Sequence, residues 1–261
     1  TLYKHTVAAA NRVNNVQPFR IGGPALANPD NKNWMKQFVA GVAANNLRLD
    51  FISWHRYHKD PQVFTRDLDF IDDLLFANNL ADRERLITEW GTDPVVGPIH
   101  LGTYEAAHFA AVTRKILDRV KVATKFEARD GLAAGGGLGI FTYNGGEKPI
   151  TVALRLLNKI SGNRILLGGE GTNVTGFATK NDTTTFVFLV NFDVNSNHLE
   201  EVPITIRGLN GAKAQIKKTI LDSFNPYGRI ETKEFDIIDG QINFSQIMQP
   251  NSVLLIEVNN L

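Results

Sequence analysis

The 261-residue chain contains no cysteine, which excludes disulfide bonds and thiolate chemistry. It also contains no run of 18 apolar residues, so no transmembrane helix is expected. Neither sign of charge is in excess, because 28 Lys and Arg accompany 27 Asp and Glu, for a formal net charge of +1. No segment is strongly basic, and we therefore expect no nucleic-acid partner.

Sequence motifs of several reaction classes are absent as well. No G-x-S-x-G turn of a serine hydrolase occurs. The glycine-rich residues 135–139 precede a predicted strand instead of opening a helix, so they suit a turn or bulge better than a phosphate-binding loop. His55 and His58 lie three residues apart without a nearby third ligand, which does not predict zinc. We expect no metal and no cofactor.

The first part of the chain alternates between helical and β patterns. Helical patterns cover residues 2–15 and 33–45 and begin again near Thr65, Thr103 and Pro149, and β patterns cover residues 19–21, 49–53, 85–88, 122–126 and 138–142. These four or five strands are too few to close an eight-stranded barrel. Residues 1–162 are therefore predicted to be half of a (β/α)8 barrel of the TIM type, with an open doubly wound sheet as the alternative.

The second part of the chain changes to near period-two alternation with β-rich composition. The clearest segments are residues 184–190, 202–206, 214–221 and 252–258, and turn residues such as Asn210-Gly211 and Asp239-Gly240 separate them. This pattern is typical of an antiparallel sandwich or barrel. The predicted fold is thus α/β over residues 1–162, followed by an all-β domain over residues 163–261.

A carboxylate and an aromatic ring stand where one predicted strand ends. Glu89 and Trp90 follow Ile87 and Thr88, just before the turn residues Gly91, Asp93 and Pro94. In parallel α/β proteins, loops at the carboxyl ends of the strands build the active site. A ring beside a carboxylate suits a sugar, whose C–H face stacks on aromatics. The alternative is a strand-end Glu that pairs with a neighbouring Arg.

A second strand end carries His55 and Tyr57. Alternation along a strand turns Ser53, His55 and Tyr57 to one face. A His and a Tyr on one face can hydrogen-bond a sugar hydroxyl and fix a neighbouring carboxylate. The alternatives are a surface loop rich in aromatics and a His whose hydrogen bonds are satisfied in the core.

A third strand end carries Glu127 and Asp130. Their carboxylates can bind sugar hydroxyls. They can equally form ion pairs with Lys125 and Arg129, and ion pairing is the more common role of such residues.

Several short motifs occur together in one order along the chain. They are Arg20-Ile21-Gly22-Gly23-Pro24-Ala25, Asp50-Phe51-Ile52-Ser53-Trp54-His55-Arg56-Tyr57, Ile87-Thr88-Glu89-Trp90, and Lys148-Pro149 with Leu156-Leu157-Asn158. In this order the chain resembles glycoside hydrolase family 39, which includes β-xylosidases and α-L-iduronidases and belongs to a clan of retaining enzymes on (β/α)8 barrels. The resemblance implies strands five to eight of such a barrel and a β-sandwich domain beside it.

The resemblance also implies roles for the candidate residues. Glu89 corresponds to the catalytic nucleophile at the end of strand seven, and His55 and Tyr57 to a pair that lines the sugar subsite. Trp90 follows the nucleophile as in many relatives, and Glu127 and Asp130 lie where relatives keep polar substrate contacts. The expected activity is retaining hydrolysis of O-glycosyl bonds in carbohydrate or polysaccharide degradation, and we favour a secreted or cell-surface location over a cytoplasmic one.

The proton donor of such an enzyme has no counterpart in the chain. In relatives it is the Glu of an Asn-Glu-Pro motif at the end of strand four, and no Asn-Glu-Pro occurs in the sequence. The chain, which starts at Thr1 inside a predicted barrel helix, is therefore expected to need an N-terminal half-barrel segment or partner chain that carries this Glu. The alternatives are a non-catalytic carbohydrate-binding or surface protein derived from a glycosidase, and a structural component of an assembly.

Overall fold

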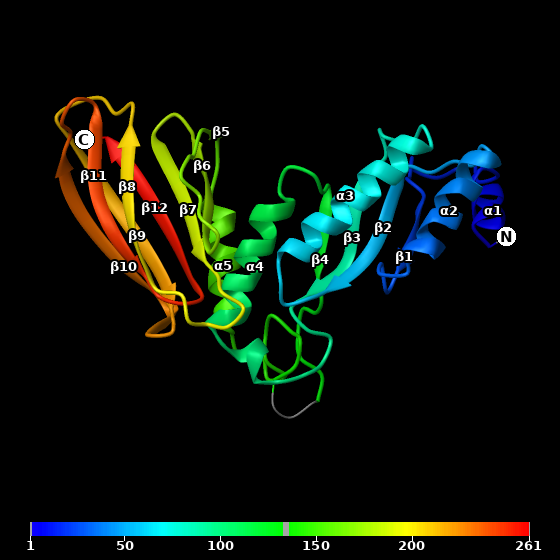
Figure 1. Cartoon of the computed structure of the whole chain (residues 1–261), viewed down its shortest axis with the longest axis horizontal. Coiled ribbons are helices and arrows are strands. Elements are labelled where there is room, and N and C mark those ends of the chain that lie inside the picture. Colours follow the sequence, from blue (N-terminus) through cyan, green and yellow to red (C-terminus); the bar gives the residue numbers. More distant parts are fainter. Residues whose placement is uncertain (1, 133–135, 261) are drawn as a thin grey trace. The chain divides into compact units, whose positions relative to one another are not determined.

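The computed structural model describes residues 2–132 and 136–260, so Gly135 of the predicted glycine-rich turn lies outside the described residues (Figure 1). Its contacts divide the chain into two compact units. The first unit comprises Thr1–Gly91 and Lys115–Phe126, and the second comprises Thr92–Arg114 and Glu127–Leu261. These units do not follow the predicted boundary between residues 162 and 163, because segments from the α/β part pack with the antiparallel strands.

The first unit contains a four-stranded parallel sheet in the order β1-β2-β3-β4. The strands are β1 (Gly22–Leu26), β2 (Phe51–Tyr57), β3 (Glu84–Gly91) and β4 (Val122–Lys125), and the helices are α1 (Leu2–Ala10), α2 (Lys32–Ala44) and α3 (Gln62–Ala77). Parallel strands that follow one another in space as they do in sequence are typical of a barrel, whereas a doubly wound sheet reverses its order. The predicted TIM-barrel-like half is therefore confirmed in outline.

Helix α3 shows why these segments fold as they do. Its buried residues include Phe64, Leu68, Ile71 and Leu75, which recur every three or four positions and so form one apolar face. The helix begins at Gln62 after Pro61, three residues before Thr65, where the sequence predicts its start.

Two predicted strands differ from the structure. The strand expected at residues 19–21 is displaced to Gly22–Leu26, whose Gly-Gly-Pro start is unfavourable for a strand and was therefore not recognised. Residues 138–142 form no regular strand, and Phe141 pairs only singly, with Arg129 and with Glu147. A few backbone hydrogen bonds, such as that from Ile140 N to Glu127 O at 2.9 Å, hold this segment instead.

The second unit contains an antiparallel sandwich, together with α5 and most of α4, which precede the sandwich strands in the sequence. Its six-stranded sheet has the order β10-β9-β12-β7-β6-β5, and its two-stranded sheet has the order β11-β8. The elements are η1 (Pro98–Leu101), α4 (Thr103–Ile116), α5 (Pro149–Lys159), β5 (Asn163–Ile165), β6 (Val174–Lys180), β7 (Thr184–Asn191), β8 (Glu200–Arg207), β9 (Lys213–Asp222), β10 (Asn225–Asp236), β11 (Gln241–Met248) and β12 (Ser252–Asn260). All four β segments highlighted in the sequence form strands.

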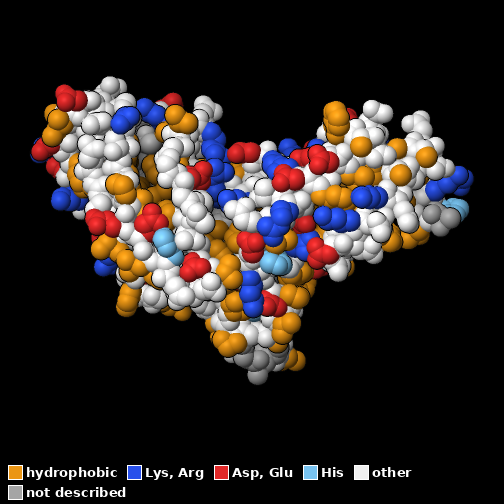
Figure 2. All heavy atoms as spheres, in the orientation of Figure 1, with side chains coloured by type: hydrophobic (Ala, Val, Ile, Leu, Met, Phe, Trp, Pro, Cys, Tyr) orange, Lys and Arg blue, Asp and Glu red, His pale blue; other side chains and the backbone are white. Residues whose placement is uncertain are grey.

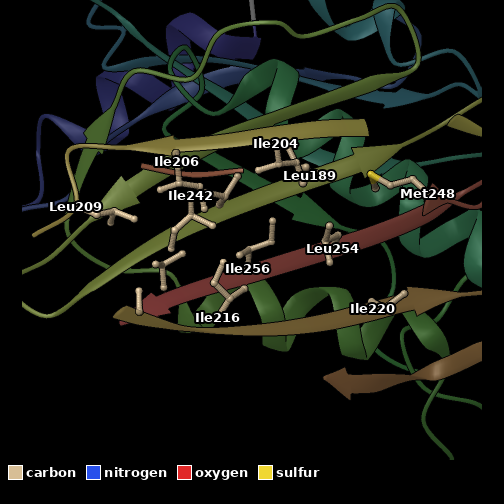
Figure 3. Packing of buried hydrophobic residues seen from close by; sticks show 14 of the residues in the cluster. Leu189, Ile204, Ile206, Leu209, Ile216, Ile220, Ile242, Met248, Leu254 and Ile256 are labelled. Carbon is tan, nitrogen blue, oxygen red and sulfur yellow. The ribbon is translucent and has the colours of Figure 1, made fainter. Parts of the chain in front are cut away.

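The core of the sandwich lies between its two sheets (Figure 3). Ile204, Ile206 and Ile242 of the two-stranded sheet pack in one cluster with Leu254 and Ile256 of the central strand β12. Helix α5 begins at Pro149 as predicted and packs against β9 and β10, so it belongs to the second unit. Apolar residues on the inner faces of the two sheets thus pack into one core, as the period-two pattern indicates.

Surface charge and helix composition concern two partners discussed from the sequence, nucleic acid and the membrane. On the face drawn in Figure 2, Lys and Arg side chains are interspersed with Asp and Glu. In the part of the chain that the structure describes, no helix has the length and apolar composition needed to cross a membrane.

Tyr3 allows a prediction about alkaline stability. Its hydroxyl donates to Arg48 O at 2.8 Å, and burial, helped by the charge of Asp50, raises the pKa of Tyr3 to about 12. An unfolded tyrosine ionises near pH 10, so between about pH 10 and 12 the Tyr3 hydroxyl keeps its proton in the folded state and loses it in the unfolded state. The stabilisation is therefore present below about pH 10 and is lost as pH rises to about 12.

We expect Tyr3→Phe to lower the free energy of unfolding at pH 7 by about 1 kcal/mol. The difference from wild type should shrink between pH 10 and 12, because the stabilisation that Phe lacks is lost there. Urea unfolding followed by the fluorescence of the buried Trp54 and Trp90 measures this difference. A constant difference across that interval would contradict the assignment.

Candidate active site

The ends of β2 and β3 meet at a β-bulge. Trp54 lies opposite Ile87, but the next residue, His55, lies opposite Glu89, so Thr88 is an extra residue in β3. The pairing of β3 with β4 shifts at the same place, between Ile87 and Trp90. Bulges of this kind redirect side chains near active sites. Here the bulge brings Glu89 directly across from His55.

Two side chains of β2 converge on one oxygen of Glu89. Tyr57 Oη donates a hydrogen bond to Glu89 Oε2 at 3.0 Å, and His55 Nδ1 lies 3.4 Å from the same oxygen. The Glu89 side chain is 36% exposed, whereas that of His55 is 19% exposed. The structure thus brings together the three residues that the sequence predicts as a nucleophile and its neighbours. The carboxylate is oriented by its partners and remains accessible.

The surroundings of Tyr57 hold its ring in place. Its ring meets that of Phe126 edge to face, with the ring centroids 6.5 Å apart. A Cβ at Gly91 would lie 3.0 Å from Tyr57 Cε1 and 3.4 Å from Lys125 Nζ, so glycine leaves the room that the ring occupies. His58 N donates to Gly91 O at 3.1 Å and ties the ends of β2 and β3 together.

Tyr57→Phe isolates the contribution of this hydrogen bond. The ring and its packing are retained, and only the hydroxyl that orients Glu89 is lost. On the expectation of glycoside hydrolysis drawn from the sequence, and in a preparation that hydrolyses an aryl glycoside, kcat/KM should fall about 10- to 100-fold, the size of effect that a small displacement of a reacting group produces, with little change in the unfolding transition. Equal rates for the two proteins would show that the hydroxyl does not act on Glu89 during the reaction.

Trp90 does not occupy the position expected for a sugar-stacking residue. Its side chain is 2% exposed and packs edge to face on Phe64 of α3, with ring centroids 5.8 Å apart. Successive strand residues point to opposite faces, so the residue after an accessible Glu89 is turned toward the core. A ring in this environment cannot present its face to a sugar, and the predicted substrate contact is corrected to a core contact.

Asp130 is likewise part of the core, in the second unit. Its carboxylate accepts from Lys148 Nζ and from Gly139 N, both at 2.7 Å, and Lys148 Nζ also donates to Gly137 O at 2.9 Å. The predicted ion-pair partners were Lys125 and Arg129, which are nearby in sequence. The observed partner is Lys148, so Asp130 has a structural role and the predicted substrate contact is corrected.

The glycines beside Asp130 follow from this ion pair. A Cβ at Gly137 or Gly139 would lie 2.6 or 2.3 Å from atoms of Asp130. The described part of the glycine-rich stretch therefore allows a close approach of backbone to carboxylate. This agrees with the turn interpretation and not with a phosphate-binding loop.

Glu127 belongs to the second unit, whereas Glu89 belongs to the first. Its side chain is half-buried, and its peptide group bonds to Leu138 O and Ile140 N. The substrate contact predicted for Glu127 stays a prediction.

Arg56 received no role from the sequence, but the structure gives it one. Together with Ile52 and Trp54 it lies at alternate positions of β2, on the buried face, and only 4% of it is exposed. Its guanidinium pairs with Asp67 of α3 and with Asp30. Burial raises the pKa of Asp67, whereas the hydrogen bond from Arg56 lowers the pKa of Asp30. A charged residue in phase with two core residues was the signal that could have predicted this pair.

Among the described residues, no three His, Asp or Glu side chains lie close enough together to hold a metal ion. What the described fold contains is a TIM-barrel-like parallel sheet with an accessible carboxylate at a strand end, and a β-sandwich unit. The chain belongs to the glycosyl hydrolases family 39, whose family model matches residues 1–232.

Individual relatives are distant in sequence and longer than the chain. A β-xylosidase of Caldicellulosiruptor saccharolyticus is 25% identical over 251 residues, which is 86% of this chain and 50% of that protein. A glucosidase structure from Croceicoccus marinus superposes with a TM-score of 0.82 at 20% identity, covering 99% of this chain and 64% of the other. A monomeric β-xylosidase structure from Caulobacter crescentus gives 0.80 at 19% identity, covering 99% and 65%. The two structures show a shared fold.

Proposed function

We propose that the protein is a retaining glycoside hydrolase in which Glu89 is the nucleophile. The observation that carries the proposal is the convergence of Tyr57 Oη and His55 Nδ1 on Glu89 Oε2, 3.0 and 3.4 Å away. Membership of family 39 supports the reaction class. The β-xylosidase relative makes β-xylosides the first substrates to test.

The chemistry proceeds in two displacements. Glu89 attacks the anomeric carbon while a second carboxylic acid protonates the departing glycosidic oxygen, which leaves a covalent glycosyl-enzyme. Water then attacks the same carbon, its proton passes to the second carboxylate, and Glu89 departs with the original configuration restored. Tyr57 and His55 keep the attacking oxygen oriented before the first step and receive it after the second.

The second carboxylate is proposed to come from outside the 261 residues. A retaining enzyme places it about 5–5.5 Å from the nucleophile. The sequence contains no Asn-Glu-Pro, the motif in which relatives carry this Glu. We assign it to an N-terminal half-barrel segment or chain, and we propose a secreted or cell-surface location for the assembled enzyme.

A fluorinated sugar that traps the glycosyl-enzyme tests the proposal. Native material that hydrolyses an aryl β-xyloside is treated with a 2-deoxy-2-fluoro-xylosyl fluoride, and the intact mass and the labelled peptide are determined. We expect one adduct per chain, on the peptide that contains Glu89, and a co-purifying segment that contains Asn-Glu-Pro. Label on another carboxylate would reject Glu89 as nucleophile. Sugar binding without hydrolysis or label would support a non-catalytic carbohydrate-binding protein instead.

A further inference from the structure

Arg56 separates the two residues that contact Glu89. His55 and Tyr57 lie on one face of β2, and Arg56 lies between them in sequence on the opposite, buried face. Because the Arg56 side chain is bonded to its Cα, contacts that immobilise the guanidinium also restrain the peptide groups on either side of Arg56. The Arg56 contacts therefore bear directly on the two groups that orient Glu89.

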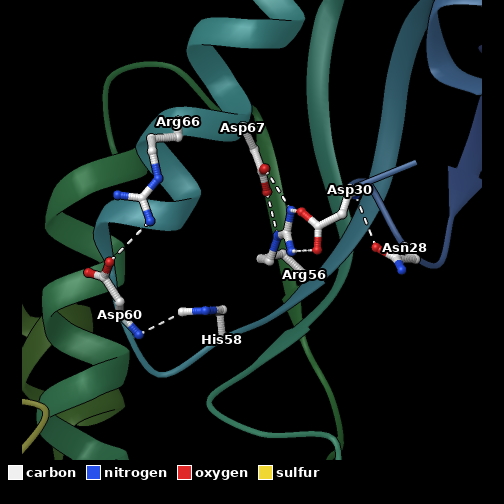
Figure 4. Close-up of polar contacts among 7 residues, drawn as sticks. All are labelled: Asn28, Asp30, Arg56, His58, Asp60, Arg66 and Asp67. Carbon is white, nitrogen blue, oxygen red and sulfur yellow. Dashed lines mark hydrogen bonds and ion pairs between the residues drawn. The ribbon is translucent and has the colours of Figure 1, made fainter. Parts of the chain in front are cut away.

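Two carboxylates hold the Arg56 guanidinium along two edges (Figure 4). Nε and Nη2 donate to the two oxygens of Asp67, at 2.6 and 2.7 Å. Nη1 and Nη2 donate to the two oxygens of Asp30, at 3.2 and 2.9 Å. A planar guanidinium bound in this bidentate way has a defined orientation as well as position. The end of β2 is thereby attached to α3 and to the segment that precedes α2.

The residues after Tyr57 are fixed as well. His58 Nδ1 accepts from Asp60 N at 2.9 Å (Figure 4). Asp60 Oδ1 accepts in turn from Gln62 N at 2.9 Å, at the start of α3. Asp60 Oδ2 also accepts from Arg66 of that helix. Tyr57 is thus held from both sides, with Arg56 as the only buried charge in this stretch of β2, residues 51–57.

Stability alone does not account for such a cluster. A buried ion pair usually stabilises a protein no more than a well-packed apolar pair of the same volume, although breaking it by removing one partner is costly. An apolar side chain in phase with Ile52 and Trp54 would continue the core. What the ion pairs add is a fixed geometry at the end of the strand.

We infer that Arg56 is a positioning residue, which sets the placement of His55 Nδ1 and Tyr57 Oη against Glu89 through its ion pairs with Asp67 and Asp30. The inference rests on the proposed function only for its catalytic consequence. The structural consequence, a defined environment of His55, can be measured without any substrate.

The substrate-free test uses Arg56→Lys and observes the His55 ring in a chain labelled with ¹⁵N-histidine. The chain has six histidines, and His55→Gln identifies the signals of residue 55. Lysine keeps the charge beside Asp67 but is a point charge that cannot form two bidentate pairs. We expect the His55 nitrogen signals to shift or broaden in Arg56→Lys.

The matched control is Arg85→Lys. Arg85 of β3 also pairs with an aspartate of α3, through Nε to Asp72 Oδ1 at 2.7 Å, but it lies opposite Ile52, three residues before His55. Because the Arg85–Asp72 pair is more exposed than the Arg56–Asp67 pair, we expect a smaller loss of stability in this control, and we expect unchanged His55 signals. His55 signals that are the same in Arg56→Lys as in wild type would overturn the inference.

The catalytic test compares rates per folded molecule in a preparation that hydrolyses a glycoside. Arg56→Lys should lower kcat about 10- to 100-fold with little change in KM, because small displacements of reacting groups have effects of this size. Asp30→Asn, whose side chain is 71% exposed in wild type, should fold normally and lower kcat less. Arg85→Lys should retain the wild-type kcat.

A double-mutant cycle then separates positioning from general damage. If Arg56 acts through Tyr57, Arg56→Lys should lower kcat much less in a Tyr57→Phe background than in wild type. Effects that multiply independently would overturn the connection between the two residues. If the wild-type assembly hydrolyses no glycoside, the proposed function fails, and the His55 signals still decide the role of Arg56.

Discussion

Glu89→Gln is expected to lower the rate of glycoside hydrolysis by about four orders of magnitude or more, the size seen when the nucleophile of an enzyme is removed. The amide has the shape of the carboxylate but cannot form the ester bond of the glycosyl-enzyme. Its oxygen can still accept the Tyr57 hydrogen bond, so the packing at the ends of β2 and β3 is retained. The measurement is kcat for an aryl glycoside in material that is active with the wild-type chain.

Glu84→Gln is the matched control. Glu84 opens the same strand, is half-buried like Glu89, and pairs with Arg20 away from the bulge. We expect this variant to hydrolyse the substrate at the wild-type rate. Turnover by Glu89→Gln equal to that of Glu84→Gln would remove residue 89 from the reaction.

Glu89→Ala adds a test that a loss of structure cannot imitate. The shortened side chain leaves room for azide, which can attack the anomeric carbon in place of the carboxylate and expel the leaving group. The product should be a glycosyl azide with inverted configuration, and the rate should rise with azide concentration. An azide-independent rate would contradict the role of Glu89 as nucleophile.

Local sequence patterns predict the site well where one strand end decides it. His55 and Tyr57 stand at the end of one strand, where alternation alone predicts that they share a face, and Glu89 stands at the end of the next strand. Their meeting at one oxygen depends on the extra residue Thr88 in β3. Nothing in the Ile-Thr-Glu-Trp run predicts a bulge, so the pairing of His55 with Glu89 becomes visible only in the structure.

The two incorrect predictions about substrate contacts share one cause, which is burial determined by distant residues. Trp90 was expected beside a sugar because it follows Glu89, but it is buried and packs against Phe64 of α3. Asp130 was expected to pair with a neighbour, but its partner Lys148 is 18 positions away. Tertiary partners at such separation leave no periodic signal. Lys148 itself stood in a motif of the family resemblance, without an assigned role.

Lys148→Met is expected to destabilise the second unit by about 3–5 kcal/mol, because it leaves the Asp130 carboxylate buried without its cation. The two side chains are only 2% and 7% exposed, so water cannot replace the lost partner. Gly139 N still donates to Asp130, which compensates for only part of the loss. All three tryptophans lie in the first unit, so hydrogen exchange of the sandwich strands is the appropriate measurement.

The double variant Lys148→Met with Asp130→Leu decides why stability is lost. Removing both charges leaves an apolar pair, which can be as stable as the buried ion pair it replaces. We therefore expect much of the protection from exchange to return in the double variant. The exposed pair Arg155–Glu147 of the same unit is the control, and Arg155→Met should change protection little. If the double variant is no more stable than Lys148→Met, the loss comes from packing around Lys148 and not from an unpaired Asp130 charge.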